Sequence, residues 1–205
     1  MGGLNGVDVS NNQGEIDWQD VAADGMTFAL IKASEGVSII DPFFKSNWQG
    51  AQSAGLRCGA YHFFHPTDSV RPQADNFLHA LGTVSFERAF FPAIIDCEVI
   101  PANMTGTQYA SCLNDFIAAL GLPVMIYASP GFWNGLGNPR VTCGGKCPPL
   151  WVAEYTNADQ PRFPAPWTGF DIWQHSDTGR VRGIQDDVDL DVIPPGSPFH
   201  FTTDA

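Results

Sequence analysis

Residues 28–64 read FALIKASEGVSIIDPFFKSNWQGAQSAGLRCGAYHFF and contain a complete strand–helix–strand unit. The runs Phe28–Ser34 and Cys58–Phe64 are short and apolar, and turn residues bound them, which is typical of buried strands. Between the two runs, the Asp41-Pro42 pair suits the N-cap and the first turn of a helix. A strand, a helix and a second strand in this order predict a parallel β/α unit.

The same kind of apolar run recurs along the whole chain, so the sequence predicts eight strands. They are Gly6–Ser10, Phe28–Ser34, Cys58–Phe64, Phe91–Glu98, Val124–Ser129, Leu150–Tyr155, Phe170–Ser176 and Val188–Ile193. Helical patterns separate the early runs: one helix follows Asp17, one follows Asp41, and two more cover Arg71–Leu81 and Thr107–Leu120. After the fifth run the spacers are short or rich in glycine and proline, so no clear helix is expected there.

Eight strands, with helices confined to the first part of the chain, favour a closed barrel. We therefore predict an α/β fold, a modified TIM-like barrel with five β/α units and three further strands, (β/α)5(β)3. An open doubly wound sheet is the alternative, but its glycine-rich phosphate-binding fingerprint is missing after the first strand, where residues 10–14 read SNNQG. A length of 205 residues suits one domain over 1–205, with the barrel at about 4–196 and a C-terminal tail at 197–205.

The net charge of the chain limits the classes of partner that it can bind. With 10 basic and 22 acidic side chains, the formal net charge is -12. Such a chain repels the phosphate backbone of nucleic acids and the surface of anionic membranes, so neither is expected as a partner. The sequence contains no stretch of about 20 apolar residues, and we expect no membrane insertion.

Acidic residues stand where the predicted strands end. Asp8 lies near the end of the first run, and Glu35 just follows the second. Asp96 and Glu98 close the fourth run, and Asp189 lies in the last. Active sites of β/α barrels lie at the carboxyl ends of their strands. We therefore predict that these carboxyl groups gather at one mouth of the barrel.

Asp96 and Glu98 are the strongest candidates for catalysis. They stand two apart on a strand, so both side chains face the same side, with Cα atoms roughly 6.6 Å apart. Crowded carboxyl groups resist ionising together, so one of them keeps its proton to higher pH. A protonated carboxyl group beside an ionised one is what glycoside hydrolysis requires. Lys32 is the only basic residue in the first four predicted strands, so few ion pairs compete with this interpretation.

Aromatic residues accompany the acids. They are Tyr61, Phe63, Tyr127, Trp151, Tyr155 and Trp173. Flat rings suit sugar faces because they remove apolar C–H surface from water. We predict that several of these rings line the mouth, and packing in the core is the alternative for each. His62 is opposite to Tyr61 in the strand alternation, so it should face the helices as a structural residue.

Five cysteines are an odd number for a fully paired secreted protein. Cys143 and Cys147 flank a glycine-rich spacer, which allows a small disulfide loop, with a zinc knuckle as the alternative. The other three cysteines fall in different apolar segments without paired metal spacing. We therefore expect no metal and no cofactor.

Short motifs across almost the whole chain resemble those of glycoside hydrolase family 25, the Chalaropsis-type lysozymes. In chain order they are Gly6–Ser10 (GVDVS), Gln13-Gly14, Ile16–Trp18 (IDW), Phe28–Gly36 (FALIKASEG), Gly59–Phe63 (GAYHF), Asp96–Glu98 (DCE), Trp173-Gln174, Gly179, Val181, Gly183 and Val188–Leu190 (VDL). Each motif is short, but their joint order is highly specific. Two residues depart from the family pattern: Cys97 stands where apolar residues are usual, and Asp191 stands where asparagine is common.

The resemblance implies a single catalytic domain that cleaves the β-1,4 bond between N-acetylmuramic acid and N-acetylglucosamine in bacterial peptidoglycan. It implies Glu98 as the catalytic acid, with three further site acids: Asp8, Asp96 and Asp189. It implies sugar contacts at Tyr61, Tyr127, Trp151 and Trp173, to which we add Glu35 and Phe63 from their places at strand ends. We expect a monomer that acts on peptidoglycan, either secreted from the cell or encoded by a phage and released at lysis.

Alternatives remain open at this point. A non-catalytic glycan-binding module would need the aromatic rings but not the paired acids. A metal-dependent hydrolase or deacetylase would use the histidines His62 and His65. For a lysozyme, the sequence does not choose between inversion and retention assisted by the substrate's 2-acetamido group, which Asp96 would hold.

Overall fold

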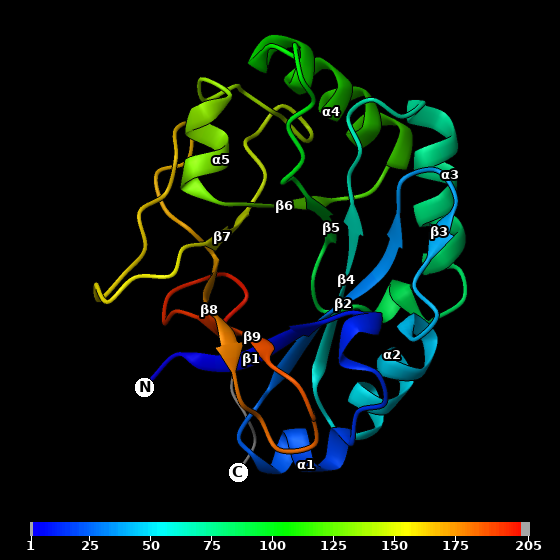
Figure 1. The fold of residues 1–205 in the computed structure, drawn as a ribbon, viewed down its shortest axis with the longest axis vertical. Helices are drawn as coiled ribbons and strands as arrows, with labels where there is room; N and C mark the ends of the chain where they lie inside the picture. Colours follow the sequence, from blue (N-terminus) through cyan, green and yellow to red (C-terminus); the bar gives the residue numbers. More distant parts are fainter. Residues whose placement is uncertain (1, 202–205) are drawn as a thin grey trace.

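The computed structural model describes residues 2–201 and shows a closed barrel of eight strands with helices outside it (Figure 1). The barrel strands are β1 (Leu4–Val9), β2 (Phe28–Glu35), β4 (Arg57–Phe63), β5 (Ala93–Asp96), β6 (Val124–Ala128), β7 (Leu150–Ala153), β8 (Ile172–Gly179) and β9 (Val188–Ile193). The barrel strands β1, β2 and β4 to β8 pair in parallel with one another. β9 closes the barrel and runs antiparallel to both β8 and β1. The predicted modified TIM-like barrel is confirmed.

Helices cover the outside of the barrel (Figure 1). They are α1 (Trp18–Ala23), α2 (Phe44–Ser53), α3 (Val70–Leu81), α4 (Gly106–Leu120) and α5 (Pro130–Gly135), with 3-10 turns at Asn11–Gln13 and Phe86–Arg88. The sequence predicts the first four helices but not α5, whose two glycines lower its helix propensity. Its start is nevertheless well specified, because the Ser129 hydroxyl accepts the Phe132 N–H at 3.1 Å and Pro130 occupies the first turn. Within residues 2–201, every helix is too short or too polar to cross a membrane.

The segment between β2 and α2 differs from expectation. Asp41 does not cap α2, which begins only at Phe44. Its carboxylate instead accepts the backbone N–H groups of Phe43 and Asn11, each at 2.8 Å. Asp41 thereby ties this segment to the loop that follows β1. A two-residue strand, β3 (Ile39–Ile40), precedes it and pairs antiparallel with the end of β2.

Strand alternation sorts the apolar side chains into two layers. Ile94 and Met125 fill the interior of the barrel, whereas Ile95 and Ile126 pack against the helices. Side chains two apart on a strand share a face, so Asp96 points to the interior side, as Ile94 does. The packing of β5 therefore aims a carboxyl group into the mouth of the barrel.

The described part of the C-terminal segment folds back onto the barrel. The rings of Phe199 and Phe201 pack against Phe91 and Phe90, with centroids 5.8 and 5.0 Å apart. Phe91 in turn contacts Phe28, the first residue of β2, so these rings cover the end where the parallel strands begin. Part of the predicted tail, residues 202–205, lies outside the described residues.

All five cysteines are free thiols in the structure, including Cys143 and Cys147. The disulfide loop that the sequence allows is therefore not formed. A tight turn through Gly144 and Gly145, both with positive φ, pairs Cys143 with Lys146 through backbone hydrogen bonds of 2.8 and 3.2 Å. This turn places Lys146 rather than Cys147 opposite Cys143.

His62 is a structural residue, as the alternation of β4 predicts. Its ring is fully buried, with Nδ1 at 2.8 Å from the Ser34 hydroxyl and Nε2 at 3.0 Å from Gln73 Oε1. The rings of Phe77 and Phe116 stack on its two faces, each with a centroid distance of 5.2 Å. Burial lowers the pKa of His62 from 6.5 to about 4.

This burial predicts a loss of stability in mild acid. The folded protein holds His62 neutral, while the unfolded chain takes up a proton below pH 6.5, so stability falls as the pH drops from about 6.5 to about 4. The full loss is about 3 kcal/mol, at about 1.36 kcal/mol per pKa unit. Urea unfolding at several pH values checks this against His62→Phe, which should be less stable overall but lack this slope. An unchanged slope in the variant would contradict the prediction.

Candidate active site

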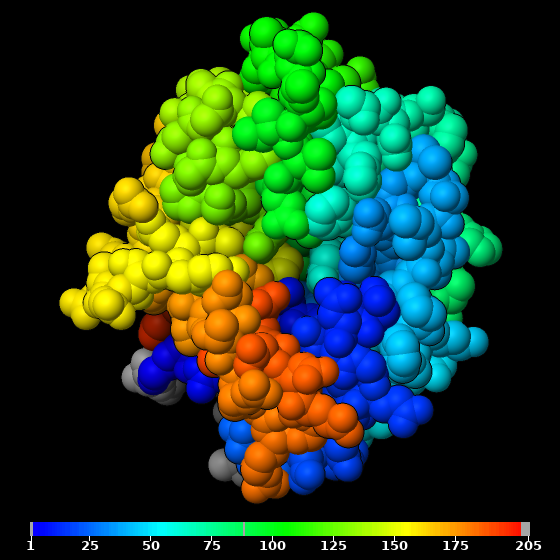
Figure 2. All heavy atoms as spheres, viewed as in Figure 1, coloured from blue at the N-terminus to red at the C-terminus, as the bar shows by residue number. Residues whose placement is uncertain are grey.

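The carboxyl ends of the parallel strands surround a cavity of about 320 Å³. All four predicted catalytic acids line it: Asp8, Asp96, Glu98 and Asp189. Figure 2 shows a hollow near the centre of one face, where the N-terminal segments in blue meet the middle of the chain in cyan to yellow and the C-terminal strands in orange. Residues far apart in the sequence thus share one opening, as their positions at strand ends predict.

Asp96 and Glu98 differ in depth. Asp96 is only 6% exposed, and its Oδ1 atom is buried without a hydrogen-bond donor among residues 2–201. Glu98 follows the end of β5 and is exposed at the mouth. Burial raises the pKa of Asp96 well above its ordinary value, and the charge of Glu98 raises it further, while Lys32 lowers it. The surrounding protein partly desolvates the Glu98 carboxyl group and thereby raises its pKa as well. The two groups therefore retain protons at a pH where free carboxyl groups are ionised.

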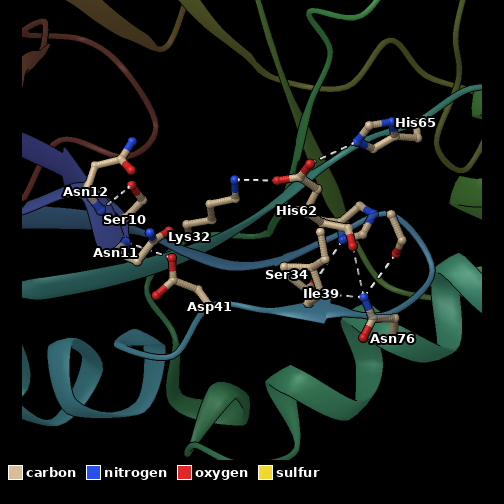
Figure 3. A network of polar contacts seen from close by, with 12 residues as sticks. Ser10, Asn11, Asn12, Lys32, Ser34, Ile39, Asp41, His62, His65 and Asn76 are labelled. Carbon is tan, nitrogen blue, oxygen red and sulfur yellow. Dashed lines mark hydrogen bonds and ion pairs between the residues drawn. The ribbon is translucent and has the colours of Figure 1, made fainter. Parts of the chain in front are cut away.

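One cation stands among the described residues that line the cavity, and it is Lys32. Its Nζ lies 2.7 Å from Glu35 Oε2 and 5.0 Å from the centroid of the Phe63 ring. His65 Nε2 approaches the other oxygen of Glu35 at 3.1 Å, so Lys32 and His65 converge on one carboxylate (Figure 3). Asn76 holds the turn after β2 by donating to the carbonyl oxygens of Glu35, Gly36 and Ile39 at 3.0–3.2 Å. The lysine is thus fixed beside the acids rather than free to swing.

Gln174 on β8 connects both sides of the cavity. Its Oε1 accepts hydrogen bonds from the hydroxyl groups of Tyr127 at 3.0 Å and Tyr155 at 2.9 Å. Its Nε2 donates to Asp8 Oδ2 at 2.7 Å. This single amide therefore orients two tyrosines and one carboxyl group.

The acids of β1 and β9 form a second group beside the first. Asp8 lies opposite Asp189 in the antiparallel pairing of these strands. Burial raises the pKa of Asp8, and the neighbouring carboxylates of Asp191 and Asp189 raise it further. Burial raises the pKa of Asp189 to about 6 and that of Asp191 to about 8. Together with Asp96 and Glu98, Asp8 and Asp189 give the cavity a strongly acidic lining, and Asp191 lies outside that lining.

Comparison with known proteins agrees with this geometry. Residues 7–184 match the family described as Glycosyl hydrolases family 25. The chain belongs to this family. It is therefore a glycoside hydrolase, and the resemblance seen in its short motifs is confirmed.

Relatives of this family 25 enzyme cover most of the chain. Lysozyme M1 of Streptomyces globisporus is 36% identical over 91% of this chain, which spans 66% of that protein, just under two thirds of its length. The N,O-diacetylmuramidase of Chalaropsis sp. is 30% identical, with 85% of this chain and 88% of that protein covered. Among solved structures, the lysozyme of Streptomyces coelicolor has a TM-score of 0.78 at 32% identity, with 97% of this chain and 94% of that chain covered. The family GH25 lysozyme of Aspergillus fumigatus has a TM-score of 0.79 at 31% identity over 93% of each chain.

The aromatic rings of the family 25 cavity differ in accessibility. Tyr61, Phe63, Tyr127 and Trp151 all line it, as predicted. Trp151 is only 1% exposed and packs against Tyr61 and Tyr127, with centroids 6.1 and 4.4 Å away. Trp151 thus serves mainly as the floor of the cavity. Tyr155 is 52% exposed and offers the largest free ring surface of the group.

Two predicted substrate-binding residues lie outside the cavity lining. Trp173 follows Ile172, an interior residue of β8, so it faces outward, and its Nε1 donates to the Glu154 carbonyl at 2.8 Å. Glu35 pairs with Lys32 and His65 beside the cavity, as described above. The alternation of β8 already indicates that Trp173 faces outward. The family motif that contains Trp173 suggested a sugar contact instead.

Sequence reasoning did not select Gln174 or Asp191 as site residues. Gln174 is 2% exposed and Asp191 is 1% exposed, and both face the interior of the barrel. The signal that could have found them is a polar residue at an inward position of a strand, two places from an apolar interior residue or from another acid.

Proposed function

We propose that this family 25 enzyme is a muramidase that hydrolyses the β-1,4 bond between N-acetylmuramic acid and N-acetylglucosamine in bacterial peptidoglycan. The observation that carries the proposal is the convergence of Asp96 and Glu98, both with raised pKa, in one cavity with Asp8 and Asp189. The names of two relatives, a lysozyme and an N,O-diacetylmuramidase, support this class of substrate.

Glu98 acts as the general acid in this proposal. It stands at the exposed mouth, where a glycosidic oxygen can reach it, while Asp96 lies deeper. No group of the described residues donates to Asp96 Oδ1, so an N–H group of a bound 2-acetamido substituent would supply a donor. A hydrogen bond to the ionised form favours ionisation, so substrate binding lowers the pKa of Asp96, and the resulting negative charge favours the protonated form of Glu98. Glu98 thereby becomes protonated for catalysis only when the sugar is in place.

The reaction then proceeds in two steps with retention. Glu98 donates its proton to the glycosidic oxygen, the bond from that oxygen to the anomeric carbon breaks, and the acetamido oxygen forms a bond to the same carbon. Asp96 stabilises the positive charge that develops on the acetamido nitrogen. In the second step the Glu98 carboxylate takes a proton from water, and the water oxygen displaces the acetamido oxygen at the anomeric carbon. Asp8 and Asp189 favour the protonated form of Glu98 through their negative charge.

The sugars bind against the rings at the rim. Tyr155, Tyr127 and Phe63 offer aromatic surface next to the acids, and such surface stabilises a sugar by covering its apolar C–H face. The acidic lining excludes polyanions such as nucleic acids, so shape and ring contacts, rather than net charge, select the glycan.

Analysis of peptidoglycan digests tests the proposal. We expect fragments with reducing N-acetylmuramic acid ends by mass spectrometry, together with falling turbidity of cell-wall suspensions. Reducing glucosamine ends would assign a glucosaminidase instead, and unchanged turbidity would favour a glycan-binding module. Proton NMR of the first product should show the β-anomer that retention requires, whereas the inverted anomer would replace acetamido assistance by direct attack of water.

The proposed substrate also predicts the cellular location of the enzyme. Its substrate lies in the cell wall, so we expect it to act outside the cytoplasm, either after secretion or at phage-induced lysis. One cavity holds all the proposed catalytic groups, so a monomer suffices for activity.

A further inference from the structure

Asp191 is a carboxyl group with incomplete hydrogen bonding at the base of the cavity. It lies two residues after Asp189 on β9, opposite Gly6 of β1, and therefore deeper in the barrel. Its side chain is 1% exposed, and Oδ1 accepts the indole N–H of Trp151 at 2.8 Å. Its Oδ2 atom is buried without a donor from the described residues. A buried carboxylate oxygen without a donor is costly, so a proton is the expected partner.

The described groups around Asp191 supply negative charge and no cation. From the elements packed against it, the titratable and polar groups that face it are Asp8 of β1, Trp151 of β7, Tyr155 after β7, Gln174 of β8 and Asp189 of β9. In the described part of the chain, no lysine or arginine forms an ion pair with Asp8 or Asp191. Two adjacent buried carboxyl groups without a cation do not ionise together, and their proton belongs to the pair.

We propose that Asp191 is a positioning residue, which shares one proton with Asp8 and thereby fixes the Asp8 carboxyl group at the cavity with one negative charge for the pair. Asp8 is then held from two sides, by the shared proton and by the 2.7 Å hydrogen bond from Gln174 Nε2. Gln174 also orients Tyr127 and Tyr155, so the shared proton stabilises the wall that meets the sugar. This inference deepens the proposed muramidase function and rests on it for its kinetic test.

Loss of the shared proton would disturb the site in two ways. It would place a second negative charge beneath the cavity, and it would remove the bond that holds Asp8. Burial raises the pKa of Asp191 to about 8, so this loss belongs to mildly alkaline pH. Once the pH exceeds the pKa values of both groups, the enzyme has lost two protons that activity needs, the one on Glu98 and the one shared by the pair.

The variant Asp191→Asn removes the shared proton but keeps the shape of the side chain. Its amide can accept from Trp151 and donate to Asp8, so the pair keeps one charge at every pH. Above the pKa values of Glu98 and of the pair, we expect kcat/KM of the wild type to fall about a hundredfold per pH unit and that of the variant only about tenfold. Asp186→Asn is the matched control, because Asp186 is an exposed acid in the β8–β9 loop. It should keep the steep wild-type slope, and an equally steep slope in Asp191→Asn would overturn the proposal.

Two readouts that need no substrate separate this inference from the proposed function. Infrared difference spectra of wild type against Asp191→Asn should show the carbonyl band of a protonated carboxylic acid, lost as the pH passes about 8. The fold holds a proton that the unfolded chain releases above its ordinary pKa of 3.8, so wild-type stability falls as the pH rises from there to about 8. The Tm advantage of the variant should therefore grow across that range. No protonated-acid band and a constant Tm difference would overturn the shared proton, even if the enzyme proves to be a muramidase.

Discussion

Replacement of Glu98 by glutamine is expected to reduce turnover of peptidoglycan by about 10²–10⁴-fold, the usual contribution of a positioned general acid. Glutamine keeps the size of the side chain but has no proton to give to the leaving oxygen. Glu98 is exposed at the mouth and its pKa is raised, so the change should keep the fold and raise the Tm slightly at neutral pH. Turbidity loss of cell walls and soluble fragments by chromatography measure the effect.

The wild-type pH profile supplies the second half of this prediction. Burial raises the pKa of Glu98, and activity requires its protonated form, so the rate should fall as the pH rises through that raised pKa. The residual activity of Glu98→Gln should lack this fall. Glu15→Gln is the matched control, because Glu15 is exposed outside the active-site cavity and should retain full activity. A Glu98→Gln enzyme with near-normal rates would refute its role as the acid.

Lys32 shows why the sequence could locate the acids but not the contacts that set their pKa values. Strand ends and alternation placed Asp8, Asp96, Glu98 and Asp189 at one mouth, because barrel closure brings the carboxyl ends of parallel strands together. The position of the Lys32 ammonium group depends on its bond to Glu35, and that bond depends on the turn held by Asn76. The contacts of Asn76 join two distant segments of the chain, and no local pattern encodes them.

Each departure from expectation has an identifiable structural cause. Helix α5 forms despite two glycines because a serine cap and a proline in its first turn compensate for weak propensity. Asp41 has the sequence context of a helix cap, yet its carboxylate accepts the backbone N–H of Asn11, in a loop thirty residues away. Propensity and spacing therefore predicted the barrel well, whereas the direction of individual polar side chains depended on tertiary contacts.

Asp96→Asn is expected to lower activity and raise stability at the same time. Loss of its negative charge removes the proposed stabilisation of the acetamido group, which should cost about 10²–10³-fold in kcat, as for other groups that stabilise developing charge. The 2-acetamido N–H would also lose its acceptor if the new amide presents its NH₂ group. Digestion of peptidoglycan under single-turnover conditions would measure the loss in the chemical step directly.

The gain in stability follows from the burial of Asp96. Its pKa is raised well above the ordinary value of 3.8 by burial and by Glu98, so the folded state holds a proton that the unfolded chain releases. The free energy of unfolding of the wild type therefore falls as the pH rises above about 4, and a neutral amide avoids this loss. We expect Asp96→Asn to be more stable by about 0.5–2 kcal/mol at pH 7, as is common when a strained active-site group is removed. Thermal unfolding at pH 4 and pH 7 should show the difference growing with pH. A variant that is less stable at pH 7 would mean that the fold depends on the buried carboxyl group, which would then be structural rather than held ready for the substrate.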